Sequence, residues 1–200
     1  MSNRYIEGDV SFYNTYITEL PDFMKGVEVR GRFNCGNNKL TTLKNSPSSV
    51  QKGGRDYTYG GGSFKCSENK LITLEGGPDY VYKHFNCGGN KLTSLQYCPS
   101  YVGGNFICSN NLLNDLRYCP TEILDSFSCS YNPFKSFIGA PIKVKGTFTC
   151  YSSKLISIEG IPEEIGGDLF LMSTVSKFTE EEIRSVCKVG GRVYIHEDQI

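Results

Sequence analysis

A 21-residue period runs through most of this 200-residue chain and constrains its fold more than any other feature. The repeated unit is Phe-x-Cys-x-x-Asn-x-Leu-x-x-Leu, and its first residue recurs every 21 residues from Phe64 to Phe148, with Leu169 continuing the series. The Phe-x-Cys steps begin at Phe33, Phe64, Phe85, Phe106, Phe127 and Phe148. One such unit cannot bury its own apolar side chains, so successive units must stack, and the sequence predicts a solenoid.

Each unit predicts one strand, one corner and one return segment. Phe and Cys alternate with other residues, which is the period of a half-buried strand. The Asn three residues after each Cys suits a tight corner, where its amide can bond backbone groups of its own coil and of the neighbouring coil. A Pro then follows, such as Pro78 or Pro99, and disfavours a regular helix. We therefore expect a β-rich solenoid with a parallel sheet, one short strand per 21-residue coil and irregular return segments.

The chain is expected to form a single domain, residues 1–200, in three parts. Residues 1–30 make a degenerate first repeat, residues 31–175 carry the regular repeats and residues 176–200 form a helix-strand cap. In the cap, a Thr followed three residues later by a Glu, at 179 and 182, is a capping box that predicts the start of a short helix. A solenoid needs such a cover at its end.

The repeat pattern resembles a known family. The order Leu-x-x-Leu, Pro-x-x-Val, Gly-x-Phe-x-Cys-x-x-Asn-x-Leu is similar to the short bacterial leucine-rich repeat, with Phe and Cys in places usually held by Leu. It resembles repeats of type III-secreted effectors of Gram-negative pathogens, and small repeat proteins of bacteria and their phages. The resemblance covers roughly residues 8 to 175. It implies a leucine-rich-repeat-like solenoid and a bacterial host protein as partner, in the host cytoplasm if the chain is phage-encoded.

Charge and hydropathy narrow the class of partner. The chain has 21 Lys plus Arg and 21 Asp plus Glu, so its formal net charge is zero. This balance argues against nucleic acid, whose binding requires the neutralisation of many phosphates. No apolar run is long enough to span a bilayer, and the first residues lack the features of a signal peptide. We therefore expect a cytoplasmic protein with no membrane partner.

The residue types that usually carry catalysis recur here in structural places. Six of the nine Cys occupy one repeat position, no Cys-x-x-Cys occurs, and the two His are isolated. Zinc sites need tight pairs of such ligands, and catalytic triads need neighbouring bases. Because Cys behaves as a small apolar group when buried, the column predicts an inert thiol ladder. We expect no catalytic residues, no metal site and no cofactor, and hence no enzyme.

The candidate binding surface consists of side chains that point away from the core, and of an insertion. The interval between Phe33 and Phe64 is 31 residues instead of 21, which places extra residues at 51–61. Tyr and Arg dominate binding hot spots, although long loops are also tolerated without any function. The insertion contributes Arg55, Tyr57 and Tyr59 as candidate partner-binding residues. The sheet face, which could equally be a merely soluble face, contributes Arg32, Lys65, His84 and Ile107, and an apolar patch near its end contributes Tyr151 and Phe170 together with Met172.

These observations predict a non-enzymatic protein–protein interaction module that binds, and thereby inhibits or redirects, a bacterial host protein. Outward tyrosines on the return segments, such as Tyr97 and Tyr118, form a second candidate surface. The alternative is a self-associating structural component of a virion or surface layer, so a homo-oligomer stays open. A weaker third reading is a sensor for a small molecule or nucleic acid.

Overall fold

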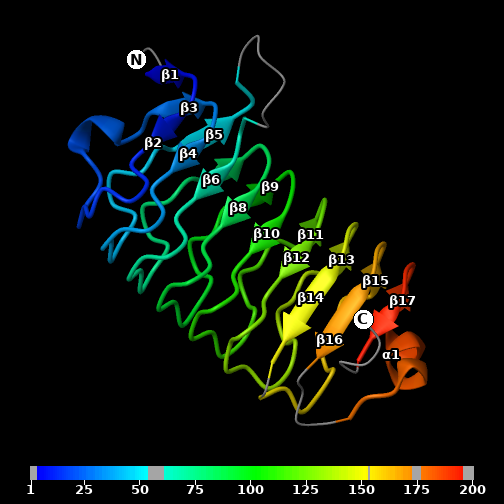
Figure 1. Cartoon of the computed structure of the whole chain (residues 1–200). Coiled ribbons are helices and arrows are strands. Elements are labelled where there is room, and N and C mark those ends of the chain that lie inside the picture. Colours follow the sequence, from blue (N-terminus) through cyan, green and yellow to red (C-terminus); the bar gives the residue numbers. More distant parts are fainter. Residues whose placement is uncertain (1–3, 54–60, 153, 173–176, 196–200) are drawn as a thin grey trace.

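The structure, a computed structural model, describes residues 4–53, 61–152, 154–172 and 177–195. The described chain winds into a solenoid of stacked coils, and the sheets run along its length (Figure 1). All strand pairings in these sheets are parallel, as the repeat predicts. The β-rich, parallel solenoid expected from the sequence is therefore confirmed.

A nine-stranded sheet, called the long sheet below, contains the Phe-x-Cys strands. Equivalent residues pair in register, so that Phe85 lies beside Phe64 on one side and beside Phe106 on the other. Five successive pairs of these Phe rings have centroids 5.2 to 5.9 Å apart. The strands of the long sheet are β2 (Val10–Ser11), β4 (Phe33–Asn34), β6 (Phe64–Lys65), β8 (Phe85–Asn86), β10 (Phe106–Ile107), β12 (Phe127–Ser128), β14 (Phe148–Tyr151), β16 (Leu169–Met172) and β18 (Val193–Tyr194).

Each coil also contains a second short strand, which the sequence analysis assigned to an irregular return segment. It forms at the Val or Ile that follows each Pro, because that side chain is buried while its neighbours face outward, for example at Val81 and Val144. The first short sheet comprises β1 (Tyr5–Glu7), β3 (Glu28–Arg30), β5 (Ser49–Gln51), β7 (Tyr80–Val81) and β9 (Tyr101–Val102). The second short sheet comprises β11 (Glu122–Ile123), β13 (Lys143–Val144), β15 (Glu164–Ile165) and β17 (Lys188–Val189).

One continuous core fills the space between the sheets and the Leu-x-x-Leu segments. The Phe, Cys, Leu and Val columns are buried from the second coil to the last, and Leu40, Leu92 and Leu116 are fully covered. Burial of each such side chain contributes about 1.5–3 kcal/mol. Because every coil contributes equivalent residues, the core is a one-dimensional stack in which each coil contacts mainly its neighbours.

The two ends of the solenoid differ. At the start, a 3₁₀ helix η1 (Asp22–Met24) lies beside the first coil. At the other end, α1 (Glu180–Val186) begins at Thr179, whose hydroxyl accepts from the Glu182 N–H at 3.1 Å, and this confirms the capping box. Within this helix Ile183 is buried, whereas Val186 is 56% exposed.

Candidate interaction surface

The cysteine column lies wholly inside the protein. All nine Cys fall in the described part of the chain as free thiols, and the six Phe-x-Cys thiols are fully buried. Burial raises the pKa of Cys35 to about 12 and holds the pKa of Cys108 well above its usual value. Only the thiolate is a strong nucleophile or metal ligand, so these residues act as core side chains, as the sequence indicates.

The asparagine column forms the corners through a repeated set of hydrogen bonds. The Nδ2 of Asn111 donates to the Cys108 carbonyl of its own coil at 3.1 Å and to the Cys87 carbonyl of the preceding coil at 3.0 Å. Its Oδ1 accepts from the Leu92 N–H at 3.1 Å. Asn69, Asn90 and Asn132 repeat these contacts. The column is therefore structural, and its amides are occupied within the solenoid.

In several coils, the residue that precedes a strand of the long sheet has a structural role that was not predicted from the sequence. The Nδ1 of His84 accepts from the Asn105 N–H at 3.0 Å, and the Oδ1 of Asn105 accepts from the Ser126 N–H at 3.1 Å. Asp9 and Asp168 make the same contact with the next coil. These side chains lie along the side of the long sheet where its strands begin, and each accepts a hydrogen bond from the backbone N–H of the next coil. This row of side chains is called the edge cap below. In most coils this position follows a Gly and often holds a short side chain that can accept a hydrogen bond. That recurrence in the sequence could have indicated the structural role.

His84 was predicted as a partner-binding residue, and it lies half-buried on the long sheet. Burial lowers the pKa of His84, and the neighbouring Lys83 acts in the same direction. A neutral imidazole is also what the Asn105 N–H requires as an acceptor. His84 therefore has a structural part in the edge cap, and one of its two ring nitrogens is occupied.

The other predicted residues on the long sheet are spread along its outer face. Lys65 is exposed and Ile107 is half-buried. Lys65 pairs with Asn86 on one side and Ile107 pairs with Asn86 on the other, so the two residues lie two strands apart. That separation is about 9.6 Å. Arg32, half-buried, precedes β4 and donates its backbone N–H to Asp9. The structure thus places these residues on one face, in neighbouring coils, without bringing their side chains into one cluster.

The predicted apolar patch at the end of the long sheet is only partly exposed. The Phe170 ring stacks on Tyr194 with centroids 4.5 Å apart, and the Tyr151 ring stacks on Tyr131 at 6.2 Å. Met172 is 1% exposed and contributes to the core instead. Its inclusion in the patch was wrong, because Met172 is buried although strand alternation places it on the same side of β16 as Phe170.

The insertion follows β5 in the chain, and the first short sheet continues past β5 to β7. Gln51 is the last residue of that strand, and a Cβ placed on Gly61 would lie 3.3 Å from the Gly53 nitrogen, so the two ends of the insertion meet. The candidate residues Arg55, Tyr57 and Tyr59 lie outside the described residues.

Tyrosines outside the long sheet form two further groups. On the first short sheet, the rings of Tyr80 and Tyr101 stack with centroids 4.8 Å apart and an interplanar angle of 5°. On the return segments, Tyr97 and Tyr118 occupy equivalent places in adjacent coils and are 54% and 63% exposed. Their backbone φ angles are +67° and +71°. A bulky residue rarely adopts this left-handed conformation.

The same place in the other coils is held by residues that tolerate a left-handed backbone. Asn45 and Gly76 precede the two tyrosines in this column, and Gly139 and Gly160 follow them, all with positive φ. The repeat pattern predicts that Tyr97 and Tyr118 face outward, whereas their backbone conformation was not predicted. The Gly and Asn residues at the matching positions were the signal that could have shown it.

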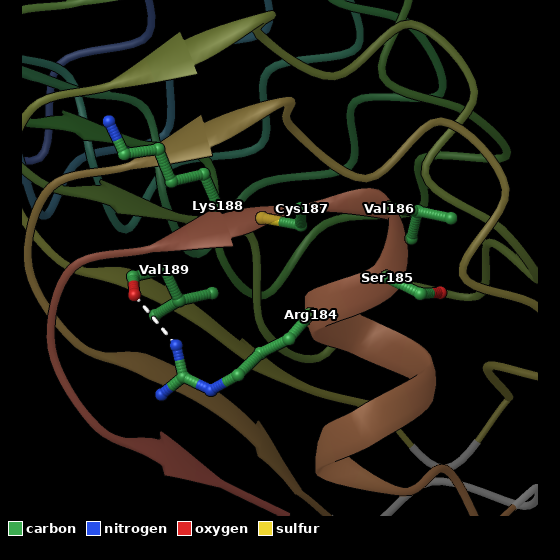
Figure 2. A pocket seen from close by; sticks show the side chains of 6 residues that line it. All are labelled: Arg184, Ser185, Val186, Cys187, Lys188 and Val189. Carbon is green, nitrogen blue, oxygen red and sulfur yellow. Dashed lines mark hydrogen bonds between the residues drawn. The ribbon is translucent and has the colours of Figure 1, made fainter.

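A shallow hollow beside α1 belongs to the C-terminal cap (Figure 2). It is lined by Arg184, Ser185, Val186, Cys187, Lys188 and Val189. The Arg184 guanidinium donates to the carbonyls of Val189 and Gly191 at 2.7 and 3.0 Å, and it pairs with Glu180 at 2.7 Å. Burial raises the pKa of Cys187 to about 11. The hollow is therefore a feature of the cap, with its Arg engaged and its thiol protonated.

The comparisons with known proteins add no functional name. The chain matches no family model, no curated protein and no solved structure. Within the described ranges, no three His, Cys, Asp or Glu side chains are grouped so that they could hold a metal ion. No helix among the described residues is long and apolar enough to cross a membrane.

Proposed function

We propose that this protein is a non-enzymatic module that binds another protein through exposed tyrosines on its return segments. The observation that carries the proposal is the pair Tyr97 and Tyr118, exposed and in left-handed backbone conformation. The resemblance to bacterial and phage repeats suggests a bacterial protein in the cytoplasm as the partner, which the module would inhibit or redirect.

The energetic argument rests on the other coils. A left-handed conformation costs a non-Gly residue about 1–2 kcal/mol. Asn45, Gly76, Gly139 and Gly160 avoid most of this cost at the same place of the same coil. Stability alone therefore favours Gly or Asn at 97 and 118. Backbone strain of this kind concentrates at functional sites, and exposed Tyr is enriched among the residues that dominate binding interfaces.

The experiment that tests the proposal is affinity capture from bacterial lysate with the double variant Tyr97→Asn/Tyr118→Asn. Asn is the natural occupant of this column at Asn45, so the variant should fold. We expect a partner that the unchanged protein retains to be lost from the variant. The matched control is Tyr16→Asn, because Tyr16 is also exposed (69%) and left-handed (φ +60°) but lies in the first coil. Equal retention by the double variant contradicts the proposal.

The alternative function is self-association, and one observation favours it. At the first coil, Phe23 and Tyr13 are 59% and 56% exposed, and β1 and β2 are edge strands of their sheets. Edge strands present unpaired backbone groups that can template pairing with another chain. Light scattering over a concentration series distinguishes the two functions. A mass that rises with concentration, and falls back in Phe23→Ser, supports self-association, whereas a constant monomer mass eliminates it.

A further inference from the structure

The outward side chains of the first short sheet form a row with one short member. The register aligns Tyr5, Glu28, Ser49, Tyr80 and Tyr101 in successive strands. Neighbouring members of such a row are about 4.8 Å apart. The Tyr80 ring stacks on Tyr101 at 4.8 Å, so its other face is directed toward Ser49. Because the Ser49 side chain is short, it leaves a slot between Glu28 and Tyr80.

The slot has the width of one planar group. Glu28 and Tyr80 are two strand spacings apart, or about 9.6 Å. Optimal contact between carbon atoms occurs at about 3.5–4.0 Å. A flat group lying on the Tyr80 ring leaves about 5.6–6.1 Å to the Glu28 position, a gap that the long Glu28 side chain can span, and a second layer, which needs at least about 10.5 Å in all, does not fit. The hydroxyl of Ser49 lies at the bottom of the slot.

The charge of the slot favours a cation. Glu28 and Glu7 both pair with Arg30, at 2.6 and 3.1 Å, so these three side chains together carry one net negative charge. A neutral aromatic group in the slot would remove water from the Glu28 carboxylate and add no partner to the single bond that it accepts from Arg30, which is costly. A guanidinium is planar, always charged, stacks on aromatic faces and pairs with carboxylates in a defined geometry. It meets all the requirements of the slot.

The protein already contains this arrangement on the other side of Glu28. The Arg30 guanidinium carbon lies 4.0 Å from the centroid of the Tyr5 ring while the same group pairs with Glu28. The slot repeats the arrangement, with Tyr80 in the place of Tyr5. We propose that the slot formed by Glu28, Ser49 and Tyr80 binds an arginine side chain of the partner protein. This inference rests on the proposed function and names one recognition element of the partner.

The first test uses a small probe with no partner. Proteins labelled with ¹³C in the Tyr rings are titrated with N-acetyl-arginine amide and, in parallel, with N-acetyl-lysine amide, up to about 50 mM, since a contact of this size is expected in the millimolar range. We expect the arginine amide to shift the Tyr80 signals at least about tenfold more strongly than the lysine amide, because an ammonium cannot stack as a plane. No Tyr80 shift, or equal shifts from the two amides, overturns the proposal.

Three variants of the slot sharpen this test. Ser49→Tyr should fill the slot, continue the aromatic row and abolish the arginine shift, and Tyr suits an outward strand position. Glu28→Gln should weaken binding several-fold. Ser49→Ala is the matched control and should leave the shift unchanged. Persistence of the full Tyr80 shift in Ser49→Tyr, at an unchanged unfolding midpoint, contradicts the slot.

The second test separates the slot from the function on which it rests. If Ser49→Tyr retains the captured partner as well as the unchanged protein does, the slot is not a recognition element, although the module still binds a partner. If the arginine amide binds in the slot but Tyr97→Asn/Tyr118→Asn retains every partner of the unchanged protein, the proposed tyrosine surface fails and the slot stands. A partner that is lost from Ser49→Tyr and kept by Ser49→Ala supports the slot, and its additional loss from Tyr97→Asn/Tyr118→Asn supports the proposed tyrosine surface.

Discussion

The coils that have an Asn corner and the coils that follow them differ in the length of their strands. From Phe33 to Phe127, the strands of the long sheet contain two residues each. In the next two coils, β14 and β16 contain four residues and pair over all four positions. The sequence changes at the same point, because Asn132 is the last Asn of the corner column and a Ser follows at 153.

The difference shows what the corner residue does. In the Asn coils the residue before the Asn is left-handed, as at Asn110 and Tyr131, and this turns the chain out of the strand. The Asn amide then binds the carbonyls and the N–H group that the turn leaves without ladder partners, as Asn111 does. Without this amide, extending the ladder is the other way to pair the backbone. In the coils from Phe33 to Phe127, the Asn amide thus accompanies a strand of two residues and starts the return segment.

The largest effect is expected from removing one corner amide. Asn111→Ala leaves the Leu92 N–H without its partner, whereas the Cys87 and Cys108 carbonyls each lose one amide donor and keep another, from Asn90 and Asn132. An unsatisfied buried group costs about 1–3 kcal/mol and each lost hydrogen bond about 0.5–1.5 kcal/mol, so we expect a loss of about 3 kcal/mol in the free energy of unfolding. Chemical denaturation measures it.

The control for this variant is Asn114→Ala, at an exposed position of the same coil. It should change the free energy of unfolding by less than about 0.5 kcal/mol. A similar small change in Asn111→Ala would mean that the corner can pair its backbone without the amide, and the explanation of strand length would then be wrong.

A smaller effect is expected from the left-handed residue beside the Asn. Gly89→Ala places a Cβ at φ +66°, which costs about 1 kcal/mol. At the equivalent place one coil earlier, Glu68→Gly removes a similar strain but loosens the unfolded chain, so the two contributions should nearly cancel. Thermal unfolding of both variants measures these changes. Equal destabilisation by the two substitutions would show that left-handed geometry is not what the corner requires.

The smallest expected effect is on the pH dependence of stability, through His84 in the edge cap. The edge cap continues through both groups of coils to Asp168. The pKa of His84 is lowered in the folded state, so the folded protein binds fewer protons there than the unfolded chain does. Stability from this group is complete above its unfolded pKa of about 6.5 and is lost as the pH falls below that value. His84→Asn, with the residue found at Asn105, should therefore flatten the decline in unfolding midpoint between about pH 7 and pH 5. An unchanged slope would contradict the role of the imidazole as acceptor.

The fold was largely predictable because the same physical requirement recurs in every coil. The Phe and Cys columns, the Asn corners and the capping box at Thr179 each follow from residue type and spacing, and the structure confirms them. The second strand of each coil was not predicted, since a two-residue strand leaves no alternation to detect in one coil. The strand with which it pairs is the equivalent segment of the neighbouring coil, and this pairing becomes visible only when the coils are stacked.

The interaction surface was less predictable for a different reason. Core positions are fixed by the packing of the coil itself, whereas outward positions are not constrained by that packing. His84 proved to be an edge cap, and Met172 proved to be buried, because both depend on the exact course of the backbone. The left-handed conformation of Tyr97 and Tyr118 also depends on it. The slot at Ser49 could be found only from the register of three strands.

The most direct test of this account measures stability and partner capture on one protein, Tyr97→Asn/Tyr118→Asn. If the tyrosines are retained for binding at a cost to the fold, the variant should be as stable as the unchanged protein or more stable, by up to about 1 kcal/mol per site, and should no longer retain the partner. A variant that loses stability and keeps full capture would show that these tyrosines serve the fold, and would contradict the account.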